Sequence, residues 1–101
     1  MAPSLHAALP LLVNVMKRKP KHKGVRVNLA NVYAELNMPD KAAKHIRKLV
    51  KLSKPGEERS GAHYMLAKHH LRAKAPQEAT VRALRFALSE DSTNDNAKHW
   101  L

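Results

Sequence analysis

The chemically active side chains with the most regular spacing are cations in the middle of the chain. Residues 41–54 contain six Lys or Arg residues, most of them three positions apart, and no acidic residue. On an α-helix these positions fall within about 140° of arc and would form one positive stripe. Such a stripe can neutralise RNA phosphates or acidic protein, although a purely solvated helix face is the alternative. The stripe consists of Lys41, Lys44, Arg47, Lys48, Lys51 and Lys54.

A second basic run precedes the stripe. The whole chain has 19 Lys and Arg against 8 Asp and Glu, a formal net charge of +11, which attracts polyanions. Aromatic residues make up only 4% of the chain, so contacts with RNA would go to phosphates rather than to stacked bases. We expect run and stripe to form one polyanion-binding face. The run consists of Lys17, Arg18, Lys19, Lys21 and Lys23.

The seven histidines do not predict a metal site. His63 and His70 share one face of an expected helix, but two turns separate them by about 10 Å, too far for both to bind one zinc ion. We expect His70 in the core instead. The chain has no Cys and three Gly, and its acids are scattered, so we predict no catalytic site, cofactor or small-molecule substrate.

Hydrophobic periodicity predicts helices throughout. Apolar residues recur at intervals of three and four from Val25 to Leu36, and again from Ala42 to Val50 after a turn at residues 37–40. A second pair of helices is expected at about residues 58–73 and 77–89, separated by the turn Lys74-Ala75-Pro76. The fold class is therefore all-α, built from antiparallel helical hairpins.

The chain also repeats itself. Ala8, Leu12 and Val15 are followed 34 positions later by Ala42, Ile46 and Leu49, and a second set recurs after 37 positions. Such periods indicate stacked hairpins, here five to six helices in a short solenoid. We predict a single domain over residues 1–101 with a partial unit at 4–20, units at 24–54 and 58–90, and the start of a further unit at 94–101. Small residues would let the paired helices approach closely: Ala30, Ala42, Ala67 and Ala79.

Two motifs carry a family resemblance. Leu29-Ala30-x-x-Tyr33 with Ala42-x-x-x-Ile46, and Leu66-Ala67-x-x-His70 with Ala79-x-x-x-Ala83, resemble the tetratricopeptide repeat. The pentatricopeptide repeat is similar in period, but its repeated base-reading positions are not found in two successive units. The tetratricopeptide resemblance implies a groove lined by the first helix of each unit. Its candidate residues here are Asn28, Asn31, Tyr64, Lys68 and Arg72.

The two ends of the chain are expected to be apolar. The stretch from Leu5 to Met16 is nearly uncharged, but it is too short for a membrane span, and Pro10 predicts that helix starts only there. The absence of Cys permits an intracellular setting, and the choice between cytoplasm and mitochondrion stays open. We expect apolar residues at the ends to dock neighbouring protein subunits: Leu9, Leu12, Val13, Phe86, Trp100 and Leu101.

Two functions fit these patterns. The first is a non-enzymatic scaffold in a larger assembly such as a ribonucleoprotein, which binds protein through its ends and RNA or acidic protein through its basic face. The alternative is an adaptor that binds an acidic or extended peptide in its concave groove.

Overall fold

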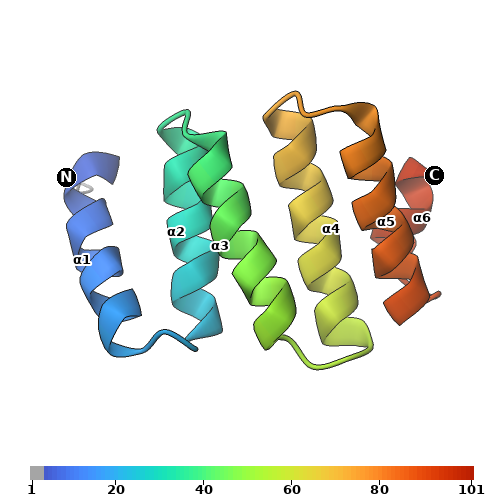
Figure 1. Ribbon diagram of the computed structural model, residues 1–101, viewed down its shortest axis with the longest axis horizontal. Coiled ribbons are helices and arrows are strands. Elements are labelled where there is room, and N and C mark those ends of the chain that lie inside the picture. Colours follow the sequence, from blue (N-terminus) through green and yellow to red (C-terminus); the bar gives the residue numbers. More distant parts are fainter. Residues whose placement is uncertain (1–3) are drawn as a thin grey trace.

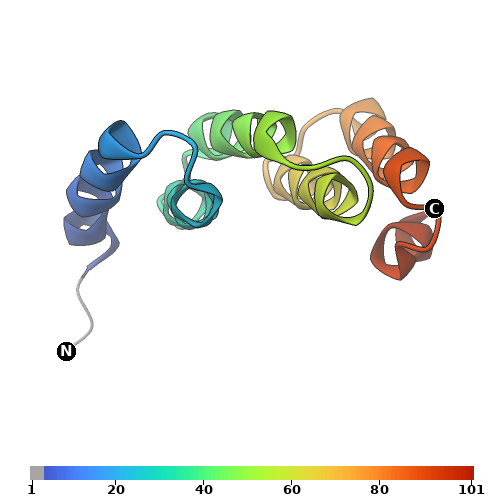
Figure 2. The same ribbon diagram turned by 90° about the horizontal axis from the view of Figure 1, so that it is seen from below.

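The computed structural model describes residues 4–101, which form six helices. Successive helices run antiparallel in a row (Figure 1), and the view along the helices shows α3 and α5 in one layer with α2, α4 and α6 in the other (Figure 2). The expected all-α architecture of stacked hairpins is confirmed. The helices are α1 (Leu5–Arg18), α2 (Lys23–Glu35), α3 (Pro39–Leu52), α4 (Glu57–Arg72), α5 (Gln77–Glu90) and α6 (Asp95–Trp100).

Local sequence explains where the helices begin. Pro39 occupies the first turn of α3, where its missing N–H costs nothing and its fixed φ favours the helix. Ser4 and Asn94 cap α1 and α6 by accepting backbone N–H groups through their side chains. Gly56 precedes α4 with a φ of 96°. Residues with a Cβ rarely adopt this backbone conformation, and glycine adopts it readily.

The core has two parts. The first lies between α2 and α3, where Leu29 and Ile46 have no exposed surface, and it extends to Ala62 on α4. The second joins α4, α5 and α6. Ala30, Ala42 and Ala67 are buried between helices, whereas Ala79 is only half-buried, at the outer edge of the α4–α5 contact.

Helix α1 begins earlier than the sequence predicted. It starts at Leu5 and contains Pro10, so the expectation that helix begins at the proline is wrong. Proline removes the hydrogen bond to the carbonyl four residues earlier, here that of His6. Both His6 and Pro10 are exposed, so water can bind this carbonyl.

The apolar residues of α1 also face differently than expected. Leu9, Leu12 and Val13 are half-buried and pack against the core of α2 and α3, so they do not form an exposed end. They turn inward because the helix needs an apolar face to attach to α2. The exposed apolar side chains of α1 are Leu5, Leu11 and Val15.

Arg26 of α2 is a buried cation. Its guanidinium donates to the carbonyl oxygen of Pro20 at 3.0 and 3.2 Å and lies 3.2 Å from Nδ1 of His45. A buried charge is tolerated only when its donors are satisfied. These bonds attach the α1–α2 connection to α3.

No helix within residues 4–101 is long and apolar enough to cross a membrane.

Candidate polyanion-binding face and groove

Five of the six cations of residues 41–54 lie on α3, whereas Lys54 follows the end of the helix and does not continue its face as expected; we call all six the α3 stripe. All six side chains are exposed. Among residues 4–101, none of them belongs to an ion pair, since the three pairs present involve other residues. The ammonium group of Lys41 lies 5.6 Å from the ring centre of Tyr33. The stripe is therefore a set of accessible cations without carboxylate partners.

The preceding basic run lies at the end of the molecule where α3 also ends. The α1–α2 connection and the α3–α4 turn occupy the same edge of the row (Figure 1). Lys17, Arg18, Lys19 and Lys21 are exposed there. Lys23 differs from the expectation of a free cation, because its Nζ pairs with Glu58 at 2.8 Å.

This ion pair also affects Glu58. The hydrogen bond from Lys23 and a second from the backbone N–H of Lys54 hold the pKa of the Glu58 carboxyl below its usual value. Lys23 thus contributes to the contact between α2 and α4 rather than to the expected polyanion-binding face.

A groove lies beside the α3 stripe, between α3 and α5, with α4 as its floor. It has a volume of about 410 Å³, and no acidic residue lines it. Arg47 and Lys51 of the stripe form one wall, and Arg82 lies on the other. We call this hollow the α3–α5 groove. Its remaining lining consists of Val50, His63, Leu66, His70, Ala79, Ala83 and Phe86.

The two histidines of the groove are neutral at neutral pH. His63 stacks on Phe86, with ring centres 5.3 Å apart, and burial lowers its pKa. Burial, and then the charge of Arg47, lower the pKa of His70. His70 lines the groove and is half-buried, so it does not take the enclosed core position that we expected. The cations at the groove are therefore arginine and lysine.

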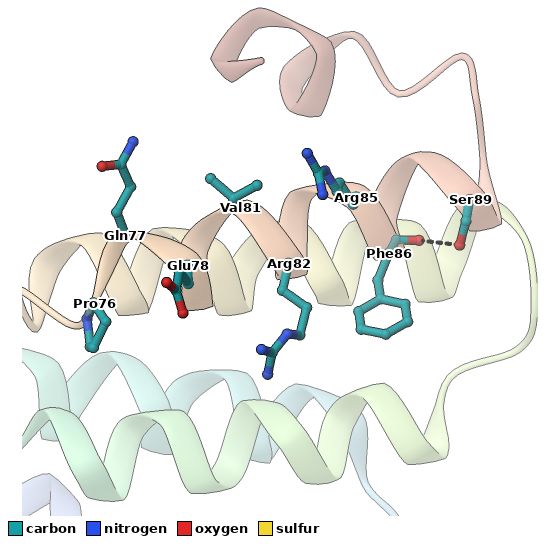
Figure 3. Close-up of a pocket in the computed structure, with 8 residues that line it drawn as sticks. All are labelled: Pro76, Gln77, Glu78, Val81, Arg82, Arg85, Phe86 and Ser89. Carbon is teal, nitrogen blue, oxygen red and sulfur yellow. Dashed lines mark hydrogen bonds between the residues drawn. The ribbon is translucent and has the colours of Figure 1, made fainter.

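Helix α5 adds two cations that sequence reasoning missed. A shallow hollow of about 980 Å³ follows the outer side of α5, where Arg82 and Phe86 point toward α3 and Arg85 points to the other side (Figure 3). Arg82 and Arg85 are exposed, and Phe86 keeps half of its surface exposed. Phe86 therefore belongs to this outer surface rather than to the end of the row. The available signal was the Arg-x-x-Arg-Phe spacing on an expected helix.

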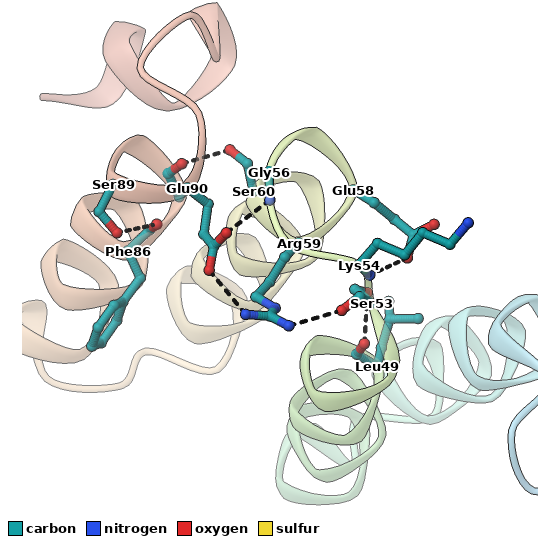
Figure 4. Close-up of polar contacts among 11 residues, drawn as sticks. Leu49, Ser53, Lys54, Gly56, Glu58, Arg59, Ser60, Phe86, Ser89 and Glu90 are labelled. Atoms are coloured by element: carbon teal, nitrogen blue, oxygen red, sulfur yellow. Dashed lines mark hydrogen bonds and ion pairs between the residues drawn. The ribbon is translucent and has the colours of Figure 1, made fainter.

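A polar network holds the walls of the groove in place. Arg59 of α4 donates to the carbonyl oxygen of Ser53 at 3.1 Å and pairs with Glu90 of α5 at 3.2 Å (Figure 4). Glu90 also accepts the backbone N–H of Gly56 at 2.8 Å, and this bond is the main reason for the lowered pKa of its carboxyl. The network ties the end of α3 to the end of α5.

Two of the cations on the side formed by α2, α4 and α6 have partners within the chain. Arg72 pairs with Glu35 at 3.1 Å, and Lys68 lies over the ring of Tyr64 at 5.4 Å. Trp100 donates from its ring nitrogen to the Tyr64 hydroxyl at 3.4 Å and is itself exposed. The two asparagines of α2 are exposed. They are Asn28 and Asn31.

Family membership follows from the sequence match. The family model of the tetratricopeptide repeat matches residues 4–54, which is half of the chain of 101 residues. The chain belongs to the tetratricopeptide repeat family. The fold of this family supports a role as a protein-interaction scaffold or adaptor. No curated protein sequence matches it.

The crystal structure of MamA has a similar fold. It superposes with a TM-score of 0.72 and 20% sequence identity, over 92% of this chain and 52% of that chain. The likeness shows the fold of the tetratricopeptide repeats. This chain spans about half the length of MamA.

The histidines of this tetratricopeptide repeat chain do not converge. Across residues 4–101, no group of three or more His, Asp or Glu residues is placed to hold a metal ion. The groove instead combines apolar side chains and neutral histidines with cations from both neighbouring helices. That arrangement suits binding of a complementary surface.

Proposed function

We propose that this chain is a non-enzymatic scaffold of a larger assembly, and that its basic outer face binds a polyanionic partner. The α3 stripe carries this proposal, because its six cations are exposed and lack carboxylate partners among the described residues. Arg82 and Arg85 extend the positive surface to α5. Both RNA phosphates and protein carboxylates provide the complementary charge.

The electrostatics of the stripe support a bound polyanion. Like charges three or four residues apart on a helix destabilise it by about 0.2–0.5 kcal/mol per pair. A polyanion relieves this repulsion and releases its own condensed counterions when it binds. Binding through the stripe should therefore weaken steeply as salt concentration rises.

The exposed apolar side chains at the ends support docking of neighbouring protein. Leu5 and Leu11 are exposed on α1, at one end of the row, and Trp100 and Leu101 are exposed at the C-terminal end of the row (Figure 1). Large exposed apolar side chains in one region are typical of protein interfaces. We propose that neighbouring subunits cover these two ends.

The test compares two charge reversals in the full chain. Lys44, Arg47 and Lys48 change to Glu in the stripe variant, whereas Lys68, Lys74 and Lys98 change to Glu in the control, which alters net charge equally. Binding of labelled polyuridine RNA and of polyglutamate is measured by fluorescence anisotropy between 50 and 200 mM salt. We expect the stripe variant to lose affinity at least about tenfold and to reduce the salt slope.

Two outcomes would overturn the polyanion-binding face. Equal losses in both variants would mean that net charge alone attracts the polyanion. A loss only in the control would favour the alternative function, a peptide adaptor that uses the side of α2, α4 and α6 and includes Lys68. Tyr64, Lys68 and Trp100 lie together on that side, which is the observation that favours the adaptor.

A further inference from the structure

We infer that the α3–α5 groove docks an acidic amphipathic segment of a partner protein. An apolar side chain of the segment enters the groove, and its flanking Asp or Glu residues pair with the cations of the walls. The inference rests on the proposed function for the negative charge of the partner. The inference specifies the groove in which the partner binds. It also specifies an apolar contact in addition to the pairing of charges.

Each of the three helices contributes apolar side chains to the groove. Val50 and Leu66 are half-buried there, and the ring of Phe86 is 50% exposed beside them. Covering a large aromatic side chain that is half exposed to water lowers the free energy. The His63 ring stacks on one face of the Phe86 ring. The rest of the Phe86 ring lines the groove. This surface favours an apolar ligand group.

The walls of the groove are cationic on both sides. Arg47 and Lys51 come from α3, and Arg82 comes from α5. None of the three belongs to an ion pair within residues 4–101. Arginine binds carboxylates through paired hydrogen bonds, and such bonds strengthen beside an apolar surface. The charge complement of these walls is a segment with acids on both sides of its apolar anchor.

The chemistry of the floor favours protein over RNA. Readers of single-stranded RNA stack successive bases on aromatic rings, but this groove offers one ring, Phe86, which His63 already covers in part. The rest of its apolar lining is aliphatic. A volume of about 410 Å³ suits one or two anchoring side chains, as in the central pockets of protein interfaces.

The wall positions are fixed before any partner arrives. Glu90 holds Arg59 of α4, and Arg59 binds the carbonyl oxygen of Ser53 at the end of α3. Helices α3 and α5 are therefore connected through α4 at one end of the groove (Figure 4). A groove that needs little rearrangement loses less free energy on binding.

The test uses two synthetic peptides of equal charge and the full chain. Both peptides are 15-residue, Glu-rich sequences; one carries central Leu and Phe residues, and the other carries Ser in their place. We expect the anchored peptide to bind about tenfold tighter or better by fluorescence anisotropy, since an apolar group in a fitting pocket contributes that much. Polyuridine RNA of matched charge is the third probe.

Point variants then show which residues cause the tighter binding of the anchored peptide. Phe86→Ser should remove the difference between the two peptides, whereas the control Leu71→Ser, at another exposed apolar residue, should leave it unchanged. Arg82→Glu should weaken both peptides, and Lys74→Glu serves as its charge-matched control. Circular dichroism verifies that each variant keeps its helices.

A measurement on the unaltered chain avoids dependence on the variants. Methyl NMR should show shifts at Val50, Leu66 and Ala79 with the anchored peptide, and none at Leu71.

Several results would overturn the inference. Equal affinity of the two peptides, an anchor advantage that survives Phe86→Ser, or methyl shifts away from the groove would each do so. RNA binding that depends on Phe86 would assign the groove to RNA instead. If the Ser peptide still binds through the α3 stripe with a steep salt dependence, the proposed function stands although this inference fails. If no probe depends on the stripe, the proposed function itself fails.

Discussion

Ser60 of α4 and Ala87 of α5 are joined by a hydrogen bond of 2.6 Å from the Ser60 hydroxyl to the Ala87 carbonyl oxygen. Ser60 has no exposed surface, and its oxygen also accepts from the side-chain amide of Asn94 at 2.8 Å. One buried hydroxyl therefore links two paired helices to the cap of α6.

Replacing Ser60 by Ala should destabilise the protein by about 1–2 kcal/mol, because the Ala87 carbonyl and the Asn94 side-chain amide each lose a hydrogen bond. Urea unfolding followed by circular dichroism measures the change. Ser89→Ala is the matched control, since the exposed Ser89 hydroxyl bonds only within its own helix, to Phe86. Similar losses in the two variants would contradict the role given to Ser60.

The two glycines near the start of α4 should respond to alanine with opposite signs. Gly56 has a φ of 96°, which strains any residue with a Cβ, so Gly56→Ala should cost about 1–3 kcal/mol. Gly61 lies within the helix, and a Cβ there meets nothing within 4 Å. Gly61→Ala should therefore add about 0.5–1 kcal/mol to stability. Thermal unfolding of both variants provides the comparison, and a stabilising Gly56→Ala would show that the turn does not need glycine.

Close helix contacts depend on small residues in both hairpins. Ala42 and Ala67 are at most 1% exposed, so Ala42→Phe or Ala67→Phe should destabilise by about 1–3 kcal/mol through overpacking. Ala7→Phe, at an exposed site on α1, is the control. Chemical unfolding curves that move equally for buried and exposed sites would refute the packing assigned here.

Acidification should weaken the fold through His45. Arginine only donates, so Nδ1 of His45 accepts from Arg26 at 3.2 Å and the ring is neutral. Burial, and then the charges of Arg26 and Lys44, lower the pKa of His45 in the folded protein. The unfolded chain consequently binds the proton more readily, and stability falls as pH drops below the ordinary histidine value of about 6.5.

The other histidines with lowered pKa act in the same direction. Burial lowers the pKa of His63, His69 and His70, so their contributions are also lost below the ordinary histidine pKa. We expect the unfolding temperature to decline between pH 7.5 and 5. His45→Gln should make this decline smaller, whereas His99→Gln, on the exposed end of α6, should not. An unfolding temperature that rises on acidification would contradict the lowered pKa of all four histidines.

Helix boundaries in the middle of the chain could be predicted because their signals are local. Pro39 and Pro76 mark the starts of α3 and α5, and Gly56 marks the start of α4. The start of α1 could not be predicted from Pro10, because the cost of an internal proline depends on whether the orphaned carbonyl meets water.

The candidate site was predictable only in part. Five cations of the α3 stripe lie on one helix, so spacing alone places them on one face. The α3–α5 groove joins residues such as Arg47 and Arg82 from helices that are not adjacent in the chain. Their proximity depends on how the hairpins stack, and helical periodicity in the sequence carries no information about this stacking. Burial of Leu9, Leu12 and Val13 against α2 likewise depends on packing between helices.

The row of helices in Figure 1 also determines how the protein should open. The main packing joins each helix to the next along the chain, so α1 and α6 each have one main neighbour while the interior helices have two. Amide hydrogens should exchange with solvent fastest in the two terminal helices and slowest in α3 and α4. A subunit bound at either tip would slow that fraying, so exchange rates could report which end a partner covers.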